Sequence, residues 1–466
     1  PFPASNCDPT QSSTLQPNTV DEVYSYTFDS DGQMEQESIN GVRRDFTYDS
    51  SGRRTAEILY RGADGTDGYC TTFSSFRYGV AERIGYGASA PGCATPVYTV
   101  ARSINSDGSI ASETNALGHT TSFEYDGLGR TTEIRPPGEA AIQIDYDGSA
   151  ASFFTRRRVS QGAYWVEVGY DGLEREISQQ NVSGTHTRQE YDGLSRIRFQ
   201  SLPSTNANSN AGDTFTYDGL GRVTSVTHAD SSSAGYAYGT TAHTTTFTDE
   251  ASRTTVYTWR AFGRPDDAWL VRVQLPGEPA PTQDTYRYLV GGHLTDVNYA
   301  GQNRTIQYNH AKKPIVEYNP EQGWKVAGYD AAGNLRCRTR FSSSTCNDTN
   351  LDDSRAEIRY SLDNLGRVTT VDYAVFRMTD VSFTYDNADN LKTMTDAAGT
   401  HTFDYTPANR LQQRVSVIQG VAYTTTYGYD SRGNLTSVAY PSGRTVTYGR
   451  DAGNRIDRVS DSTATY

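Results

Sequence analysis

Hydrophobic and polar residues alternate in short runs along most of the chain. Residues 120–125 read Thr-Thr-Ser-Phe-Glu-Tyr, and comparable runs rich in Thr, Tyr, Phe and Val follow one another to the C-terminus. A period of two predicts β-strands, and the glycine-containing segments between the runs predict tight turns. The only stretches that suggest a helix are short, at 58–61 and 266–273. The pattern therefore predicts an all-β chain built of antiparallel hairpins.

A six-residue motif recurs between these runs. Tyr125-Asp126-Gly127-Leu128-Gly129-Arg130 recurs unchanged from Tyr217 to Arg222, and degraded copies such as the one at Tyr329 follow a period of about 21 residues. One repeat is then a strand, a tight turn, a second strand and a looser turn. The motif positions that we expect to build the tight turns are Tyr125, Asp126, Gly129, Arg130, Tyr217, Asp218, Gly221, Arg222, Tyr329, Asp330 and Gly333.

Each residue type in the motif has a structural role in a turn. Asp accepts hydrogen bonds from backbone N–H groups two or three residues further on, and Gly supplies a positive φ. The Tyr ring is expected to cover the turn with its hydroxyl in water, and the Arg to pair with an acidic residue of the next hairpin. We interpret the motif as structural, and no residue of it as catalytic.

Composition and charge narrow the class of protein. Only 35% of residues are hydrophobic, yet 33 Tyr, 16 Phe and 4 Trp are present, and disordered chains are poor in aromatics. A sheet with at least one solvent-exposed face fits both the low hydrophobic share and the high aromatic content. The net charge of -13 disfavours nucleic acid as a partner, since phosphate binding needs clustered Lys and Arg. No apolar run approaches the roughly 18 residues of a membrane helix.

The five cysteines are sparse and form no metal-binding pairs. Cys337 and Cys346 bracket a polar loop, and Cys70 and Cys93 flank a glycine-rich stretch, so we predict two loop-closing disulfides. They would place the protein in an oxidising compartment, secreted or at the cell surface. Cys7 is then free or links two copies in a homo-oligomer. The alternative is five free thiols.

The chain reads as one repeat domain. Residues 1–20 are polar and proline-rich and are expected to form a linker or arm, whereas 21–466 are expected to form the repeat domain and to continue beyond the C-terminus. Irregular stretches at 61–96, 201–213, 275–284 and 340–354 interrupt the repeats.

The Tyr-Asp turns closed by Gly-Arg or Gly-Asn resemble the RHS or YD-repeat family over about residues 21–466. The resemblance implies a ribbon of successive hairpins that spirals into a hollow shell, as in bacterial toxin components, wall-associated proteins and teneurins. Toxin-type members close the shell with a protease plug that bears an Asp-Pro-x-Gly signature. Here the only Asp-Pro is Asp8-Pro9, at the other end of the chain.

Sheet geometry also favours a hollow form. About thirty strands spaced roughly 4.8 Å apart make a ribbon about 145 Å long, and open sheets rarely exceed about ten strands without curling. If the shell encloses a polypeptide, we expect its inward face to be polar, because a sticky wall would hold the enclosed chain too tightly. If the protein is a scaffold or adhesin, inserted loops such as 201–213 or 340–354 can fill the lumen instead.

Enzyme signatures are missing from the sequence. The seven histidines are scattered without a metal-binding pattern, and neither a nucleophile elbow nor a dinucleotide loop is present. We therefore predict no enzyme, no catalytic residue, no cofactor and no metal.

Three functions remain open. The first is a non-catalytic shell that encapsulates a toxin or effector polypeptide in a secreted bacterial protein. The second is an extracellular or cell-surface structural or adhesive protein, including one that forms filaments, and the third is a glycan hydrolase on a repeat scaffold. The expected partners are an enclosed polypeptide or other subunits of a larger assembly.

Overall fold

The computed structural model describes residues 23–62, 65, 67–147, 155–239, 243–261, 268–277, 283–289, 292–339, 358–373 and 378–462. Within these residues it contains 38 β-strands and no helix. Each strand pairs antiparallel with the next one in sequence, from β1–β2 to β37–β38. The chain is thus one continuous antiparallel ribbon, as the alternation predicts.

The first half of the ribbon carries short strands joined by tight turns. Its strands are β1 (Tyr24–Phe28), β2 (Met34–Ile39), β3 (Val42–Tyr48), β4 (Arg54–Tyr60), β5 (Gly68–Arg77), β6 (Val80–Ser89), β7 (Tyr98–Ile104), β8 (Ile110–Thr114), β9 (Thr120–Tyr125), β10 (Thr131–Arg135), β11 (Ile142–Tyr146), β12 (Arg156–Gln161), β13 (Tyr164–Tyr170), β14 (Glu176–Asn181), β15 (His186–Tyr191), β16 (Ile197–Ser201), β17 (Gly212–Tyr217), β18 (Val223–Thr227) and β19 (Ser233–Tyr238).

The second half continues in the same way. Its strands are β20 (Thr244–Thr248), β21 (Thr254–Ala261), β22 (Ala268–Gln274), β23 (Asp284–Tyr288), β24 (Leu294–Tyr299), β25 (Gln302–Tyr308), β26 (Pro314–Asn319), β27 (Gly323–Tyr329), β28 (Leu335–Thr339), β29 (Ile358–Leu362), β30 (Val368–Asp372), β31 (Val381–Tyr385), β32 (Leu391–Thr395), β33 (Gly399–Tyr405), β34 (Leu411–Ile418), β35 (Val421–Tyr429), β36 (Leu435–Ala439), β37 (Thr445–Arg450) and β38 (Ile456–Asp461).

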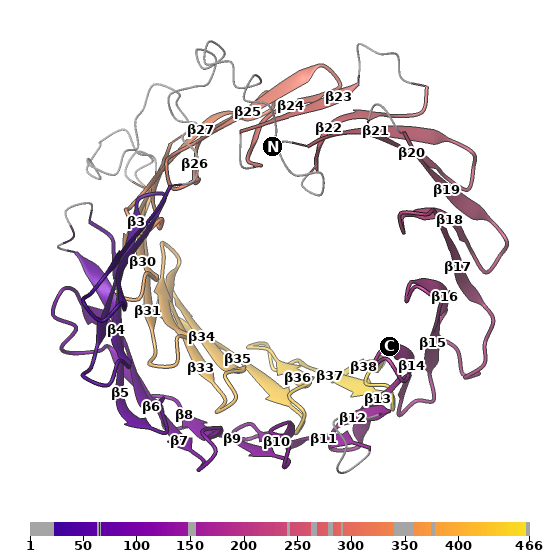
Figure 1. Cartoon of the computed structure of the whole chain (residues 1–466). Coiled ribbons are helices and arrows are strands. Elements are labelled where there is room, and N and C mark those ends of the chain that lie inside the picture. Colours follow the sequence, from indigo (N-terminus) through magenta and orange to yellow (C-terminus); the bar gives the residue numbers. More distant parts are fainter. Residues whose placement is uncertain are drawn as a thin grey trace, which may run out of the picture.

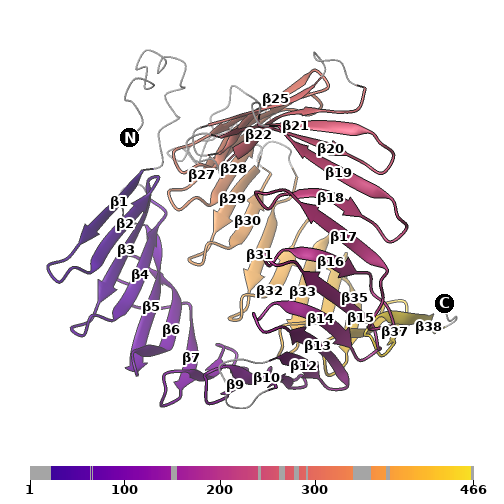
Figure 2. The same cartoon turned by 45° about the vertical axis from the view of Figure 1, so that its right-hand side comes forward.

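The ribbon winds into a coil around an open centre (Figure 1). Strands β3 to β26 complete nearly one turn, and β28 to β38 then run along the inner side of the picture beside the first strands. Figure 2 shows the same path from the side, as a rising spiral rather than a closed ring. We call the strands from β1 to β22 the first coil and those from β27 to β38 the second coil. The hollow, spiralling shell expected from the sequence is confirmed.

A recurrent bulge accompanies the coiling. In the β17–β18 hairpin Tyr217 pairs with Val223 and Thr216 with Ser225, so that Thr224 is an extra residue. The same register shift occurs beside the motif tyrosine in β9–β10, β31–β32 and β35–β36, among others. A bulge bends its strand and increases its twist. Because the bulges recur at the same place in successive hairpins, they favour a regular curvature.

The hydrophobic core is thin, as expected for a ribbon that is one sheet thick. One small buried cluster joins Ile58, Tyr60, Cys70 and Ala88 in β4, β5 and β6. A second joins Val326 to Cys337 in β27 and β28. Packing alone therefore holds only small parts of the molecule together, and the turns and backbone ladders hold the rest.

Some expectations from the sequence are wrong or fall outside the described residues. No helix forms at 58–61, where β4 runs to Tyr60, and β22 occupies 268–274 instead of a helix. The described residues form 38 strands rather than about thirty. The segments 1–20 and 340–354, with Cys7 and Cys346, lie outside the described residues. None of the described residues forms a helix long and apolar enough to span a membrane.

Candidate functional site

The motif turn is closed by its aspartate. In the turn after β9 the Oδ1 atom of Asp126 accepts the backbone N–H groups of Leu128 at 2.9 Å and Arg130 at 3.0 Å. Backbone bonds link Gly129 N–H to the Asp126 carbonyl and Asp126 N–H to the Arg130 carbonyl. Gly129 has a φ of 77°, in the left-handed region that side chains resist. One carboxylate and one glycine thus fix the reversal.

The other predicted turns have the same geometry. Asp218 accepts the N–H groups of Leu220 and Arg222 at 2.9 Å each, and Gly221 has a φ of 83°. In the turn after β27, Asn334 takes the place of the arginine. Its backbone N–H donates to Asp330 Oδ1 at 2.8 Å, and its side-chain amide donates to Oδ2 at 3.1 Å. Gly333 again has a φ of 83°.

The motif tyrosines do not leave their hydroxyls in water, and that expectation is wrong. Tyr125 Oη donates to the Ile110 carbonyl at 3.0 Å, and Tyr217 Oη donates to the Ile197 carbonyl at 2.6 Å. The acceptor is in each case a residue in the second strand of the preceding motif hairpin. The same bond is made by Tyr48, Tyr191, Tyr238, Tyr288, Tyr308, Tyr329, Tyr385, Tyr405 and Tyr429. The tyrosine therefore ties each hairpin to the one before it.

The motif arginine also acts differently from the expectation. Arg130 Nε donates to its own turn's Asp126 at 2.7 Å, and its guanidinium carbon lies 4.4 Å from the centre of the Tyr146 ring in the next hairpin. The next hairpin thus offers an aromatic face, and an acid as well in the case of Arg367, whose Nη1 lies 2.6 Å from Asp389 Oδ1 as expected. Comparable pairs are Arg175–Tyr191, Arg196–Tyr217, Arg222–Tyr238 and Arg367–Tyr385. We call this repeated set of Asp, Arg and Tyr contacts the turn ladder.

The ladder changes the acidity of its carboxylates. The side-chain hydrogen bond from Arg196 lowers the pKa of Asp192, and the backbone N–H of the same residue lowers it further. The pKa of Asp49 is lowered in the same way by Arg53. For Asp171 the bond from Arg175 outweighs the opposing effect of desolvation. Each carboxylate therefore stays ionised at a lower pH than a free aspartate.

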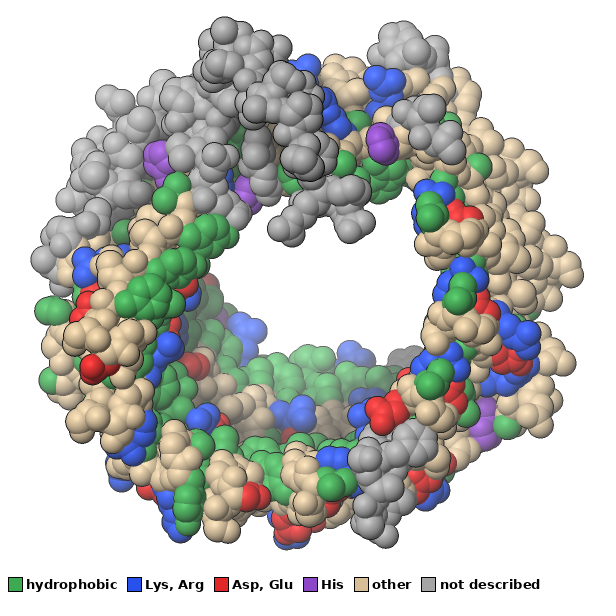
Figure 3. All heavy atoms as spheres, in the orientation of Figure 1, with side chains coloured by type: hydrophobic (Ala, Val, Ile, Leu, Met, Phe, Trp, Pro, Cys, Tyr) green, Lys and Arg blue, Asp and Glu red, His purple; other side chains and the backbone are tan. Residues whose placement is uncertain are grey.

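The two faces of the ribbon differ in polarity. In β31, Val381, Phe383 and Tyr385 lie on one face, while Ser382 and Thr384 are exposed on the other. The polar face is joined across strands by hydroxyl pairs such as Thr216–Thr224 at 2.8 Å. Figure 3 shows hydrophobic side chains gathered on the inner surface of the ring, with Lys and Arg among them, and mainly other residue types on the outer surface. The expectation of a polar inner face is therefore wrong.

The coils meet along a seam. We call the edge formed by the turns after odd-numbered strands the YD rim, and the edge formed by the remaining turns the opposite rim. At the seam, the YD rim of the second coil lies on the opposite rim of the first coil. Its polar contacts are Arg61 Nη1 to the Asp363 carbonyl at 2.9 Å, Ala331 N–H to the Arg61 carbonyl at 2.9 Å, Asn364 Nδ2 to Ser89 Oγ at 3.0 Å, Tyr98 Oη to Asp389 Oδ2 at 2.7 Å, the ion pair of Arg410 with Glu139, and Ala140 N–H to the Ser431 carbonyl at 2.5 Å.

Two seam residues show how closely the rims fit. Desolvation, together with the hydrogen bond to Asp389, raises the pKa of Tyr98 far above its usual value. The side chain of Leu365 packs on the backbone of Gly87, where an added Cβ would lie only 2.8 Å from Leu365 Cδ2. The sequence did not indicate the seam, because its partners are roughly 270 to 300 residues apart.

The cysteines divide into two cases. Cys70 and Cys93 are disulfide-bonded, with their Cα atoms 5.5 Å apart, as predicted from their flanking positions. The bond anchors the 90–97 connection, next to Val97 and Tyr98 of the seam. Cys337 is buried in β28, and its predicted bond to Cys346 stays a prediction because Cys346 lies outside the described residues.

One arrangement resembles a catalytic constellation. His401 Nδ1 lies 2.8 Å from Ser416 Oγ, and His401 Nε2 lies 3.5 Å from Asp396 Oδ1. Both His401 and Ser416 are buried, and Arg414 donates to the same hydroxyl at 3.1 Å, so the serine is held within the sheet. Among the residues that the structure covers, no group of three or more His, Cys, Asp or Glu is placed to hold a metal ion.

Comparisons with known proteins agree with this architecture. The RHS repeat family model matches residues 105–140, 413–445 and 429–465. The Tc holotoxin pore of Photorhabdus luminescens, with a TccC3 mutation, superimposes with a TM-score of 0.57 at 12% identity over 96% of this chain and 26% of that chain. The TcdB2–TccC3 complex gives a TM-score of 0.38 at 12% identity over 98% of this chain and 30% of that chain. No curated protein sequence matches.

The protein spans only about a quarter of the matched chain in the holotoxin structure. At 12% identity, this likeness shows a similar fold and nothing more. The family model nevertheless agrees with the repeated turn ladder, and the superimposed fold agrees with the hollow coil. The chain therefore carries RHS repeats at three segments, and its hollow coil is similar in fold to the Tc holotoxin pore structure.

Proposed function

We propose that the chain is a non-catalytic wall segment of a hollow shell that encloses a polypeptide. The observation that carries the proposal is the open centre of the coil, lined by the apolar face of the ribbon (Figures 1 and 3). An unfolded chain exposes apolar side chains, and contact with an apolar wall removes them from water without requiring a defined sequence. Residues 21–466 would form one domain of such a shell, continued by further repeats.

An interspersed set of cations keeps the wall from being uniformly adhesive. Arg196 and Arg222, for example, lie over the Tyr217 and Tyr238 rings, so charged groups interrupt the aromatic surface. The wall can then shield a polypeptide through many weak contacts and still release it. The polar lumen expected from the sequence is not needed for release.

A toxin-type role follows by analogy with the similar fold. The structure of comparable fold is a Tc holotoxin pore. We propose an extracellular site of action for this chain, in line with its Cys70–Cys93 disulfide. The competing function is an extracellular structural or adhesive protein.

Protease protection of the natural full-length protein tests encapsulation. We expect trypsin to spare a segment in the folded protein that it digests when the segment is expressed separately. Phe215→Asp, on the apolar face of β17, should shorten that protection, whereas Thr216→Asp, its exposed neighbour on the other face, should not. A full-length protein with no protected segment would favour the structural role.

A further inference from the structure

The seam uses only one rim of each coil. The second coil's YD rim covers the first coil's opposite rim, as in the contact of Arg410 with Glu139. The first coil's YD rim and the second coil's opposite rim face away from the seam (Figure 2). The described residues therefore present two uncovered halves of the same kind of interface, at the two ends of the spiral.

Exposed leucines mark the uncovered YD rim. The third residue of the turn is Leu128, Leu173, Leu194 or Leu220, with exposed fractions of 54%, 68%, 73% and 80%. Leu365 occupies the same turn position on the second coil. It is only partly exposed, because it packs on Gly87 and beside Val97 across the seam. A motif leucine is thus a side chain that a neighbouring coil covers.

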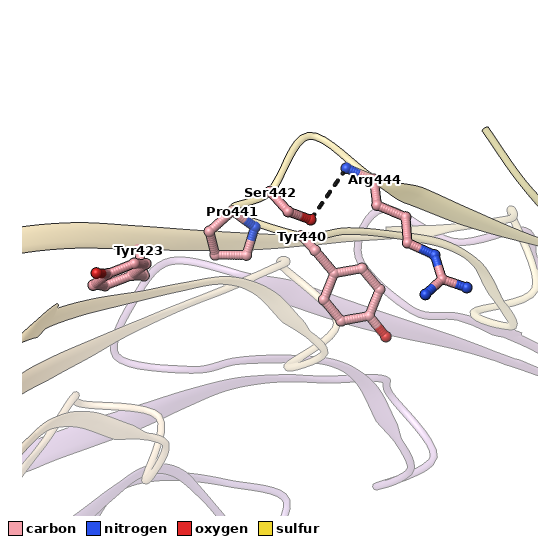
Figure 4. A pocket seen from close by; sticks show the side chains of 5 residues that line it. All are labelled: Tyr423, Tyr440, Pro441, Ser442 and Arg444. Atoms are coloured by element: carbon pink, nitrogen blue, oxygen red, sulfur yellow. Dashed lines mark hydrogen bonds between the residues drawn. The ribbon is translucent and has the colours of Figure 1, made fainter. Parts of the chain in front are cut away.

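A cleft marks the uncovered opposite rim. Tyr423 of β35 and the turn residues Tyr440, Pro441, Ser442 and Arg444 line an open cleft of about 500 Å³. Figure 4 shows Pro441 between the two tyrosine rings, with the Arg444 side chain to one side. Both tyrosines are exposed, the Arg444 N–H donates to Ser442 Oγ, and the Tyr440 N–H donates to the Arg444 carbonyl. The cleft offers apolar surface at the turn level, where a leucine from a stacked rim would enter.

We propose that two copies of this chain associate head to tail, with the leucine-bearing YD rim of one copy on the Tyr423–Tyr440 cleft and adjoining rim of the other. The contact continues an interface that the chain already makes with itself. A second copy is the fitting occupant, because its rim from Leu128 to Leu220 spans five motif hairpins and is of the kind that the second coil already lays on the first coil's opposite rim. Since the two surfaces differ, the association leaves one free surface at each end and can extend. The proposal does not depend on encapsulation.

Sedimentation of the intact chain and two complementary variants tests this arrangement. We expect the wild-type mass to rise above 51.3 kDa with concentration. The double variant Leu194→Asp with Leu220→Asp blocks the rim, and Tyr440→Asp blocks the cleft, so each alone should stay at the mass of one chain. An equimolar mixture should give twice that mass and no more, because each variant keeps the surface that the other lacks.

A matched control separates the proposed contact from a general effect of charge. Gln179→Asp places the same carboxylate on an exposed residue in the middle of strand β14, away from both rims, and should associate as the wild type does. Circular dichroism of every variant should match the wild type, since the substituted side chains are exposed. A wild-type chain that stays monomeric at tens of micromolar, or variants that do not pair when mixed, would overturn the proposal.

Discussion

The turn ladder and the seam hold the molecule together in different ways. Along the ladder, neighbouring hairpins repeat one set of contacts, such as Asp192 with Arg196 and Arg196 with the Tyr217 ring. At the seam the contacts follow no repeated set, for Leu365 packs on Gly87 while Arg410 pairs with Glu139. The ladder depends on residues one repeat apart, whereas the seam depends on residues a whole turn of the coil apart.

The two sets of contacts therefore affect different properties: the ladder affects the stability of the hairpins, and the seam affects the shape of the coil. A ladder contact recurs, so the loss of one weakens one hairpin and leaves its neighbours paired, as in other repeat proteins. A seam contact occurs once and keeps the coil from opening. Variants of the ladder should therefore change unfolding, whereas changes at the seam should act on how the coils stack.

Acid should produce the largest effect, because it acts on many turns at once. The aspartates with a lowered pKa contribute stability that is complete above the ordinary Asp value of about 3.9. That contribution is lost as the pH falls through their folded pKa values. They include Asp49, Asp126, Asp171, Asp192, Asp218, Asp249, Asp430 and Asp451. Circular dichroism during acid titration should show unfolding below pH of about 4, and an unchanged signal down to pH of about 2 would contradict the ladder.

Removal of the Cys70–Cys93 disulfide should have the next largest effect. A bridge across 23 residues stabilises by about 3 kcal/mol in the chain-entropy account. The double variant Cys70→Ser with Cys93→Ser should lose that stability in denaturant unfolding, and its 90–97 connection should exchange amide hydrogens faster. Equal midpoints for the two proteins would show that the bridge does not brace this end of the seam.

A single motif glycine should matter less. Gly221→Val forces a branched side chain to a φ of 83° and should cost about 1–3 kcal/mol. Gly219→Ala in the same turn is the control, because Gly219 has an ordinary φ and nothing lies within 4 Å of an added Cβ. Hydrogen exchange of the β17–β18 hairpin should speed up in the first variant only, and equal rates in both would refute the assigned role of Gly221.

The smallest effect should come from one tyrosine hydroxyl. Tyr217→Phe removes the part-buried bond to the Ile197 carbonyl, at a cost of about 1 kcal/mol. Tyr78→Phe removes a hydroxyl from an exposed ring and serves as the control. If both variants unfold with the same midpoint, the hydroxyl does not tie neighbouring hairpins together.

The sequence predicted what depends on nearby residues. The period of two predicted the strands, the Asp and Gly positions predicted the turns, and the positions of Cys70 and Cys93 beside one irregular stretch predicted their bond. It did not predict the acceptor of the Tyr217 hydroxyl, because the position of the Ile197 carbonyl depends on pairing across two hairpins and on the bulges. The alternation in β31 showed two unlike faces, but the direction of curvature decides which face is inside, and no single residue encodes that direction.

A designed disulfide across the seam tests most directly whether the ribbon winds into a hollow coil. An added Cβ at Gly138 would lie 3.7 Å from the Cβ of Pro407, a separation that suits a disulfide. Gly138→Cys with Pro407→Cys should therefore form a bond in the folded protein, seen by mass spectrometry of unreduced peptides. Gly118→Cys with Pro407→Cys should not, since nothing lies within 4 Å of a Cβ at Gly118. Free thiols at 138 and 407 in the oxidised, folded protein would contradict the coil.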